Sequence, residues 1–288
     1  MLCFRGIAEI DDIKLVPCDD CDLVKYCGNE CQRDHKLQHE EVCKKRAAEL
    51  RDELLFKQPE STHLGDCPIC CLPMPPDPQQ SRMADCCSKV ICDGCARANL
   101  KRERETRLVP SCPFCRKPLP STYEEVYKQR MKRIEANDPV TLCQEGNLQR
   151  EKGDYHSAFE YWTKAAELGD VEAHYHLSVM YRFGDGVEKE KGKEIYHLEE
   201  AAIGGEPCAR YNLGFIEWNS HNNAERAVKH WIFAAKQGHD DSIKWLMAAF
   251  RQGFISKDVL AAALRAHKAA VDATKSPQRE AAERYSQM

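Results

Sequence analysis

Apolar residues in the second half of the chain recur at helical spacing, and the pattern itself repeats every 33–36 residues. In each copy, four positions at offsets i, i+4, i+7 and i+8 lie on one face of a helix. The copies read Ala158, Trp162, Ala165 and Ala166; Glu194, Leu198, Ala201 and Ala202; Ala227, Trp231, Ala234 and Ala235; and Ala262, Ala266, Ala269 and Ala270. This period predicts stacked helix pairs that form an α-solenoid.

A glycine follows the helix in three copies, at Gly169, Gly205 and Gly238, where a left-handed helix cap is expected. With these signatures, roughly residues 138–275 resemble the Sel-like repeat family, relatives of the tetratricopeptide repeat. The resemblance implies a scaffold that holds other proteins in a concave groove. Two alternatives stay open for three aromatic residues, which either line this groove or pack between the helices: Tyr175, Tyr211 and Trp245.

The first part of the chain differs in composition, because fifteen of the 17 cysteines lie within residues 1–115 of 288. The start of the chain shows no charged leader followed by an apolar stretch, so we expect a cytoplasmic or nuclear protein. In that setting, cysteines at short regular spacing indicate metal sites rather than disulfides. No apolar run is long enough to span a membrane, and the net charge of −4 argues against a general nucleic-acid binder.

Eight of these cysteines are arranged in pairs, three of which are separated by two residues. They are Cys67 and Cys70, Cys86 and Cys87, Cys92 and Cys95, and Cys112 and Cys115. A two-residue gap lets two thiolates bind one tetrahedral zinc ion, so the set supplies two closed structural sites.

This arrangement resembles the RING finger. The resemblance implies that Cys67 and Cys70 share one zinc with Cys92 and Cys95, and that the remaining four cysteines bind the other. It also implies binding of a ubiquitin-conjugating enzyme, and therefore ubiquitin-ligase activity without a nucleophile of its own. The expected contact residues are Ile69, Leu100, Pro113 and Arg116. Arg116 stands where many ligases place the arginine that bridges the conjugating enzyme and ubiquitin.

A non-enzymatic interaction scaffold with purely structural zinc fingers is the alternative function. It is motivated by Asn99, which stands at an otherwise apolar family position, and by the adjacent cysteines 86 and 87. After the metal assignment, Cys71, Cys143 and Cys208 are left over. A cysteine nucleophile needs a spare thiol with a basic neighbour, and we expect no nucleophilic catalysis from these three.

Residues 18–43 carry a second cysteine pattern, which resembles the MYND finger through Tyr26-Cys27 and Cys31-Gln32. The family's interleaving implies one complete site and a second, incomplete one. The complete site takes Cys18, Cys21, His39 and Cys43. The incomplete site takes Cys27 and Cys31 with Cys3, and Gly6 stands where the fourth ligand would be. The resemblance implies protein or peptide partners. We therefore expect three zinc ions, and a fourth if the incomplete site is filled.

These features predict a mainly α protein in which small zinc-stapled MYND and RING modules precede the α-solenoid. The expected parts are the MYND-like finger (1–43), a helical linker (44–66), the RING-type finger (67–120), a linker helix (121–137), the Sel-like repeats (138–275) and a C-terminal helix (276–288). Ser276 and Pro277 have the residue types expected at the start of that last helix.

Overall fold

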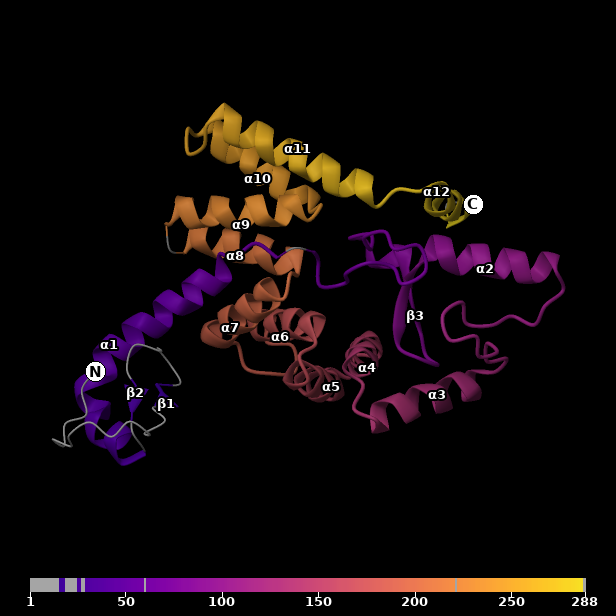
Figure 1. Cartoon of the computed structure of the whole chain (residues 1–288), viewed down its shortest axis with the longest axis horizontal. Helices are drawn as coiled ribbons and strands as arrows, with labels where there is room; N and C mark the ends of the chain where they lie inside the picture. The colour runs from indigo at the N-terminus through magenta and orange to yellow at the C-terminus, as the bar shows by residue number, and fades with distance from the viewer. Residues whose placement is uncertain (1–15, 19–24, 27–28, 60, 221, 287–288) are drawn as a thin grey trace, which may run out of the picture. The chain divides into compact units, whose positions relative to one another are not determined.

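The computed structural model describes residues 16–18, 25–26, 29–59, 61–220 and 222–286. The chain divides into two compact units, residues 1–57 and residues 58–288. Figure 1 shows the mainly helical character of both units, and each unit is described here by itself.

The first unit consists of a short strand pair and one long helix. Strand β1 (Val16–Pro17) pairs antiparallel with β2 (Lys25–Tyr26), and helix α1 (Asn29–Leu55) follows. The helix expected after the finger is not a separate element but the C-terminal part of α1. The helix continues from the finger into this stretch because no glycine or proline interrupts it.

The second unit begins with residues 67–120, which we call the two-cluster module. Its elements are the 3-10 helix η1 (Pro78–Gln80), strands β3 (Ser81–Ala84) and β4 (Lys89–Cys92), and helix α2 (Asp93–Glu105). β3 and β4 form an antiparallel hairpin in which Ser81 faces Cys92. The small apolar core contains Met74, Ile91 and Ala96 beside three cysteines. Because a core of this size gives little stability, folding of the module depends on metal binding.

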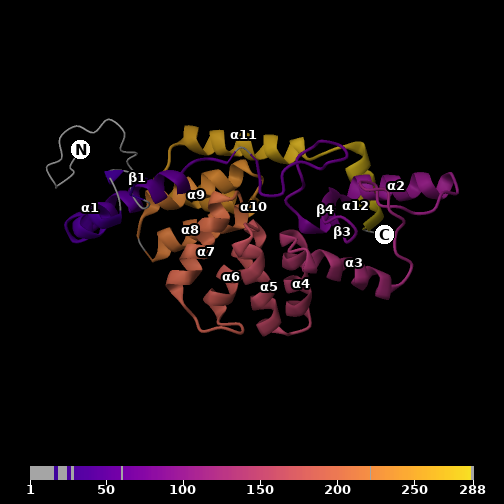
Figure 2. The same ribbon diagram turned by 60° about the horizontal axis from the view of Figure 1, so that its bottom comes forward.

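Ten further helices follow in the described part of the second unit. They are α3 (Tyr123–Glu135), α4 (Pro139–Glu151), α5 (Tyr155–Glu167), α6 (Val171–Phe183), α7 (Lys191–Ile203), α8 (Pro207–Asn219), α9 (Ala224–Lys236), α10 (Asp240–Arg251), and the C-terminal α11 (Lys257–Ala273) and α12 (Pro277–Ser286). Figures 1 and 2 show α4 to α11 stacked as successive antiparallel pairs, which is the predicted solenoid. None of the helices in the described ranges is long and apolar enough to cross a membrane.

Side-chain caps explain where most of these helices begin. In eight helices, the side chain of the residue immediately before the helix accepts a hydrogen bond from a backbone N–H group of the first turn, as helix N-caps do. The capping residues are Thr122, Asp138, Asp154, Asp170, Glu206, Asn223, His239 and Ser256. The predicted start of the last helix is also confirmed, since the N–H of Arg279 donates to Ser276 Oγ.

The predicted repeat face is confirmed in three copies and wrong in the fourth. Trp162, Leu198 and Trp231 are buried together with the alanines that follow them, and the three glycine caps have φ between +86° and +92°. In α11, however, Ala262 and Ala269 are exposed, and Ala263 is the buried residue. The set of buried residues differs from that of the other copies because α11 is the last solenoid helix. No further repeat in the described part of the chain packs on its outer face, so alanines on that face stay exposed.

Each tryptophan of the repeat face packs against a glycine on the preceding helix. A Cβ atom on Gly146 would lie 2.6 Å from the Trp162 ring, and one on Gly214 would lie 2.5 Å from Trp231 Nε1. In the middle copy the smaller Leu198 replaces tryptophan, and Ser178 takes the place of glycine. Glycine and tryptophan therefore occur as a pair, because the indole fills the volume that a side chain would need.

We expect Gly214→Ala to lower the free energy of unfolding by about 1–3 kcal/mol, because the new methyl group overlaps the Trp231 indole. The measurement is urea unfolding of the zinc-loaded chain followed by tryptophan fluorescence. The control is Gly192→Ala, where a Cβ meets nothing within 4 Å and stability should stay equal or rise slightly. Equal stability of the two variants would contradict the packing argument.

Candidate zinc centres

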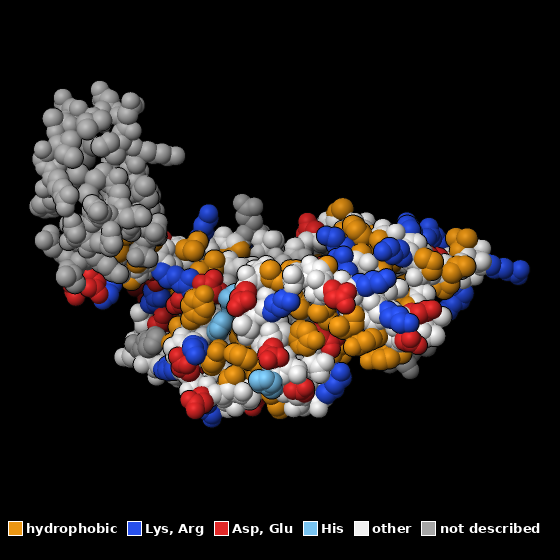
Figure 3. All heavy atoms as spheres, turned by 90° about the horizontal axis from the view of Figure 1, so that it is seen from below, with side chains coloured by type: hydrophobic (Ala, Val, Ile, Leu, Met, Phe, Trp, Pro, Cys, Tyr) orange, Lys and Arg blue, Asp and Glu red, His pale blue; other side chains and the backbone are white. Residues whose placement is uncertain are grey.

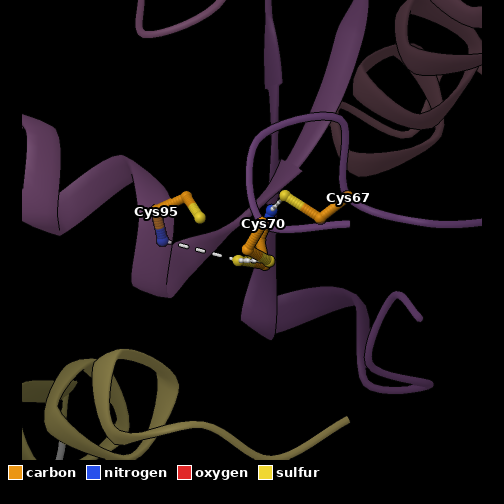
Figure 4. Close-up of side chains that lie close together, drawn as sticks. Cys67, Cys70 and Cys95 are labelled. Atoms are coloured by element: carbon orange, nitrogen blue, oxygen red, sulfur yellow. Dashed lines mark hydrogen bonds between the residues drawn. The ribbon is translucent and has the colours of Figure 1, made fainter. Parts of the chain in front are cut away.

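The two-cluster module brings its eight cysteines together as two groups of four. Within each group the Sγ atoms all lie within 4.8 Å of one another; one group is Cys67, Cys70, Cys92 and Cys95, and the other is Cys86, Cys87, Cys112 and Cys115. We call them the first and the second cysteine cluster. In the first cluster, the side chains of Cys67, Cys70 and Cys95 point toward a common space (Figure 4).

Sulfur-to-sulfur distances in both clusters suit zinc. Four sulfurs at about 2.3 Å from a tetrahedral zinc ion are about 3.8 Å apart. Cys70 Sγ and Cys92 Sγ are 3.9 Å apart in the first cluster. In the second cluster the corresponding distances are 3.3 Å between Cys86 and Cys115 and 3.9 Å between Cys87 and Cys112. Four thiolates at such distances repel one another strongly without a cation, so the donor set and the geometry both fit a zinc ion.

Matching loops present the first and last cysteine pairs. In one loop the N–H of Cys67 donates to Leu72 O, and the N–H of Cys71 donates to Cys67 O. In the other, the N–H of Cys112 donates to Lys117 O, and the N–H of Arg116 donates to Cys112 O.

The residue after the second cysteine has positive φ in both loops: 55° for Cys71 and 62° for Arg116. Cys71 thus has a backbone role in its loop although its exposed thiol lies outside both cysteine clusters.

The adjacent cysteines 86 and 87 reach one cluster through the turn between β3 and β4. The N–H groups of Cys87 and Ser88 both donate to Ala84 O, and Ser88 has φ of 55°. This tight turn rotates the backbone between the two residues, so that both thiols face the pair Cys112 and Cys115.

Backbone N–H groups favour the thiolate form at one cysteine of each cluster. Burial raises the pKa of Cys67, but N–H hydrogen bonds from Cys92, Cys70 and Ile69 outweigh it and lower the pKa to about 7. Burial likewise raises the pKa of Cys115, where the N–H of Lys117 and the neighbouring thiols lower it to about 7. Because zinc binds thiolates, these hydrogen bonds assist metal binding near neutral pH.

The C-terminal helix contributes an arginine to the first cysteine cluster. Arg279 Nη2 donates to Cys70 Sγ at 3.4 Å and to Leu72 O at 3.2 Å, while Nη1 donates to Pro73 O at 2.6 Å. Gly94 in α2 allows this close approach, since a Cβ there would lie 2.9 Å from Arg279 Cα. Zinc with four thiolates carries a net charge of −2, and the buried guanidinium compensates part of it.

The second cysteine cluster is held from α3 by two further arginines. Arg133 donates to Ser88 Oγ at 2.8 Å and to Cys87 O at 3.1 Å, and it also pairs with Asp138 at 2.8 Å. Arg130 donates to Asp85 at 3.1 Å. The turn that presents cysteines 86 and 87 is thereby bonded to the start of the solenoid.

The expected partner-contact residues lie on or beside the two loops. Ile69 is 41% exposed, Arg116 is exposed, and Pro113 and Leu100 are half-buried. Asn99 links the loops to α2, because its Nδ2 donates to Ser111 O at 3.1 Å and its Oδ1 accepts from Arg116 Nη1 at 3.5 Å. Phe114, which the sequence did not single out, is 41% exposed beside them.

In the N-terminal unit the structure describes part of the expected finger site. Cys18 Sγ and Cys43 Sγ are both buried and lie 3.7 Å apart, close to the spacing of sulfurs around one zinc ion. Cys31 and His39 lie on α1, but their side chains are outside the described part of the structure. The other finger residues, Cys3, Cys21 and Cys27, also lie outside it.

Comparison with known protein families identifies the N-terminal finger and the helical repeats. The MYND finger family matches residues 2–43, and the Sel1 repeat family matches residues 142–170, 171–206 and 209–239. The chain therefore contains an N-terminal MYND finger and three Sel1 repeats, which are modules for protein–protein contact. These modules and the cysteine clusters support zinc binding and protein–protein contact.

Two solved structures are similar to parts of this chain. A Sel1 repeat protein from Oxalobacter formigenes is 21% identical, with a TM-score of 0.46, over 67% of this chain and 84% of that one. A protective antigen of uropathogenic Escherichia coli strains with an SLR fold is 20% identical, with a TM-score of 0.43, over 51% of this chain. The match spans about a third (34%) of that antigen. No curated protein matches the chain.

We expect Arg279→Ala to speed zinc loss from the first cysteine cluster by about 10- to 100-fold, since it removes the donor to Cys70 and the link to two loop carbonyls. Zinc transfer to a coloured chelator measures the rate. Arg284→Ala removes an exposed arginine of the same helix and should leave the rate unchanged. Equal rates for both variants would contradict a supporting role for Arg279.

Proposed function

We propose that the two-cluster module is a RING-type finger and that the protein is a ubiquitin ligase. In this proposal the module recruits a ubiquitin-conjugating enzyme, while the MYND finger and the repeats hold substrates or other partners. The observation that carries it is the interleaving of the cysteine pairs, in which the first pair groups with the third and the second with the fourth.

The positions of three side chains support the same function. Ile69 and Pro113 each lie between the two cysteines of a Cys-x2-Cys loop, and Ile69 is exposed. Arg116 follows the last cysteine, is exposed, and is held by Asn99 Oδ1. A planar guanidinium can bond carbonyl groups of two partners at once, which suits a residue that bridges the conjugating enzyme and ubiquitin.

Ligase activity of this type needs no nucleophile from the protein. The module would bring the charged conjugating enzyme close to a substrate and restrict its orientation, and both effects raise the rate of transfer. The hydrogen bonds from Arg130 and Arg133 to the cysteine turn support this view, because they give the module a defined position on the repeats that hold the substrate.

The second candidate function is a scaffold without ubiquitin transfer. Asn99 favours it, since the amide bonds Ser111 O and Arg116 where the RING family places an apolar residue. The half-buried Leu100 beside it offers less apolar surface to a partner than an exposed side chain would. This alternative keeps the zinc sites and the interaction modules but lacks a docking surface for a conjugating enzyme.

Autoubiquitination in a reconstituted mixture, with a broad panel of conjugating enzymes, tests the proposal. We expect chains to form with at least one enzyme, and Arg116→Ala to lower the rate about tenfold or more, as loss of a charge-assisted contact does. Lys117→Ala is the matched control, because it removes the neighbouring exposed cation of the same loop. Ile69→Ala should also lower the rate, with zinc content unchanged in all three variants.

Absence of transfer with the whole panel would contradict ligase function and favour the scaffold. Transfer that is equal in the Arg116 and Lys117 variants would contradict the role given to Arg116.

A further inference from the structure

A third group of metal-binding side chains lies in the solenoid, away from both cysteine clusters. The Sγ of Cys143 on α4, the carboxylate of Glu172 on α6 and the imidazole of His176 on α6 lie within 4.8 Å of one another. Cys143 is buried, and the other two are half-buried. Cys143 lies outside the cysteine pairs of the sequence and was therefore not predicted to bind a metal.

Neighbouring groups fix the orientation of these side chains. The His176 ring stacks on Trp162 with a centroid distance of 4.7 Å, and His176 Nε2 is 3.3 Å from Glu172 Oε1. Glu172 and His176 lie one helical turn apart, so both face the α4 side. The carboxylate of Asp170 is fixed nearby by its bond from the N–H of Ala173 and interacts with Cys143. Two carboxylates and a thiol in a partly buried site favour a bound cation.

The segment that precedes the two-cluster module carries a histidine, His63, whose pKa is lowered by burial and is also influenced by Glu172 and His176. Residues 61–66, which we call the strap, run along the repeat helices in Figure 2. The strap is bonded there by the N–H of His63 to Gly205 O at 3.1 Å and by Gln237 Nε2 to Ser61 O at 3.2 Å.

The imidazole of His63 is under the electrostatic influence of Glu172 and His176. Its Nδ1 is buried and has no hydrogen-bond partner within the described part of the chain. Burial lowers the pKa of His63, and the charge of Glu172 opposes this effect, so the two side chains are near each other.

The corresponding positions in the next two repeats carry different chemistry. Cys143 corresponds to Tyr175 and Tyr211, and His176 corresponds to Asn212 and Trp245. In the last of these repeats the tyrosine hydrogen-bonds the residue that corresponds to His176: Trp245 Nε1 donates to Tyr211 OH at 3.2 Å. At the first junction a short thiol replaces the phenol, and the three donor atoms converge on the space between the helices.

We propose that Cys143, Glu172 and His176, together with His63 from the strap, bind one zinc-type divalent cation. Sulfur, nitrogen and carboxylate oxygen at a tetrahedral site are ligands that zinc and cobalt accept, whereas calcium and magnesium prefer oxygen alone. Because His63 lies four residues before Cys67, the bound ion ties the entry to the first cysteine cluster to the repeats.

Loading the full-length protein with cobalt(II) in place of zinc tests the site, because cobalt bound to a thiolate absorbs through ligand-to-metal charge transfer. We expect Cys143→Ser to bind one equivalent less than the parent chain and to lose the corresponding absorption. Added zinc should displace this cobalt. The matched control is Cys208→Ser, which removes the other solenoid cysteine and should leave the stoichiometry unchanged. Cys3→Ser should also keep this equivalent, which separates the site from the MYND finger.

Conservative variants keep the test independent of folding. Glu172→Gln and His176→Gln retain the side-chain size and should each weaken cobalt binding about tenfold or more, with an unchanged circular dichroism spectrum. His63→Gln should weaken it similarly, and an unchanged affinity would remove His63 from the ligand set. Equal stoichiometry and absorption in Cys143→Ser and the parent chain would overturn the proposal.

Discussion

The guanidinium of Arg279 connects the end of the chain to the first cysteine cluster, and the arrangement of the second unit depends on this contact. It joins residues 209 positions apart through Cys70 Sγ and two loop carbonyls. Arg133 does the same for the second cysteine cluster from α3. A small metal-stapled module has little apolar surface of its own, so hydrogen bonds to loop carbonyls and thiols fix its position on the helices.

Within the solenoid, packing is set by pairs of positions on successive helices. Trp162 and Trp231 pack where Gly146 and Gly214 leave room, and Leu198 and Ser178, which are both buried, stand at the corresponding positions of the middle copy. This periodic pairing makes each junction geometrically similar, so a change in residue type at one junction alters its chemistry without altering the backbone. The first junction differs in this way, with donors suited to a metal where later junctions have neutral aromatic and amide groups.

The surface is consistent with a protein that contacts several partners. Acidic, basic and hydrophobic side chains are interspersed on the face shown in Figure 3, and exposed apolar side chains of the two-cluster module include Ile69 and Phe114. Along the chain, the MYND finger precedes the cysteine clusters and the Sel1 repeats follow them. The described zinc-ligand groups are structural in character because four cysteines leave no coordination position open.

The sequence by itself determined the solenoid, its three glycine caps and the start of the last helix, because periodicity and cap residues are local properties of the chain. The grouping of the eight clustered cysteines was expected from the resemblance to the RING finger. The sequence placed the repeat face correctly in three copies and failed for Ala262, where burial depends on whether another helix follows. Only the tertiary structure decided the roles of Arg279, Arg133 and Asn99, and it alone brought Cys143 to Glu172 and His176. These contacts join residues on different elements, and no spacing along the chain encodes which elements meet.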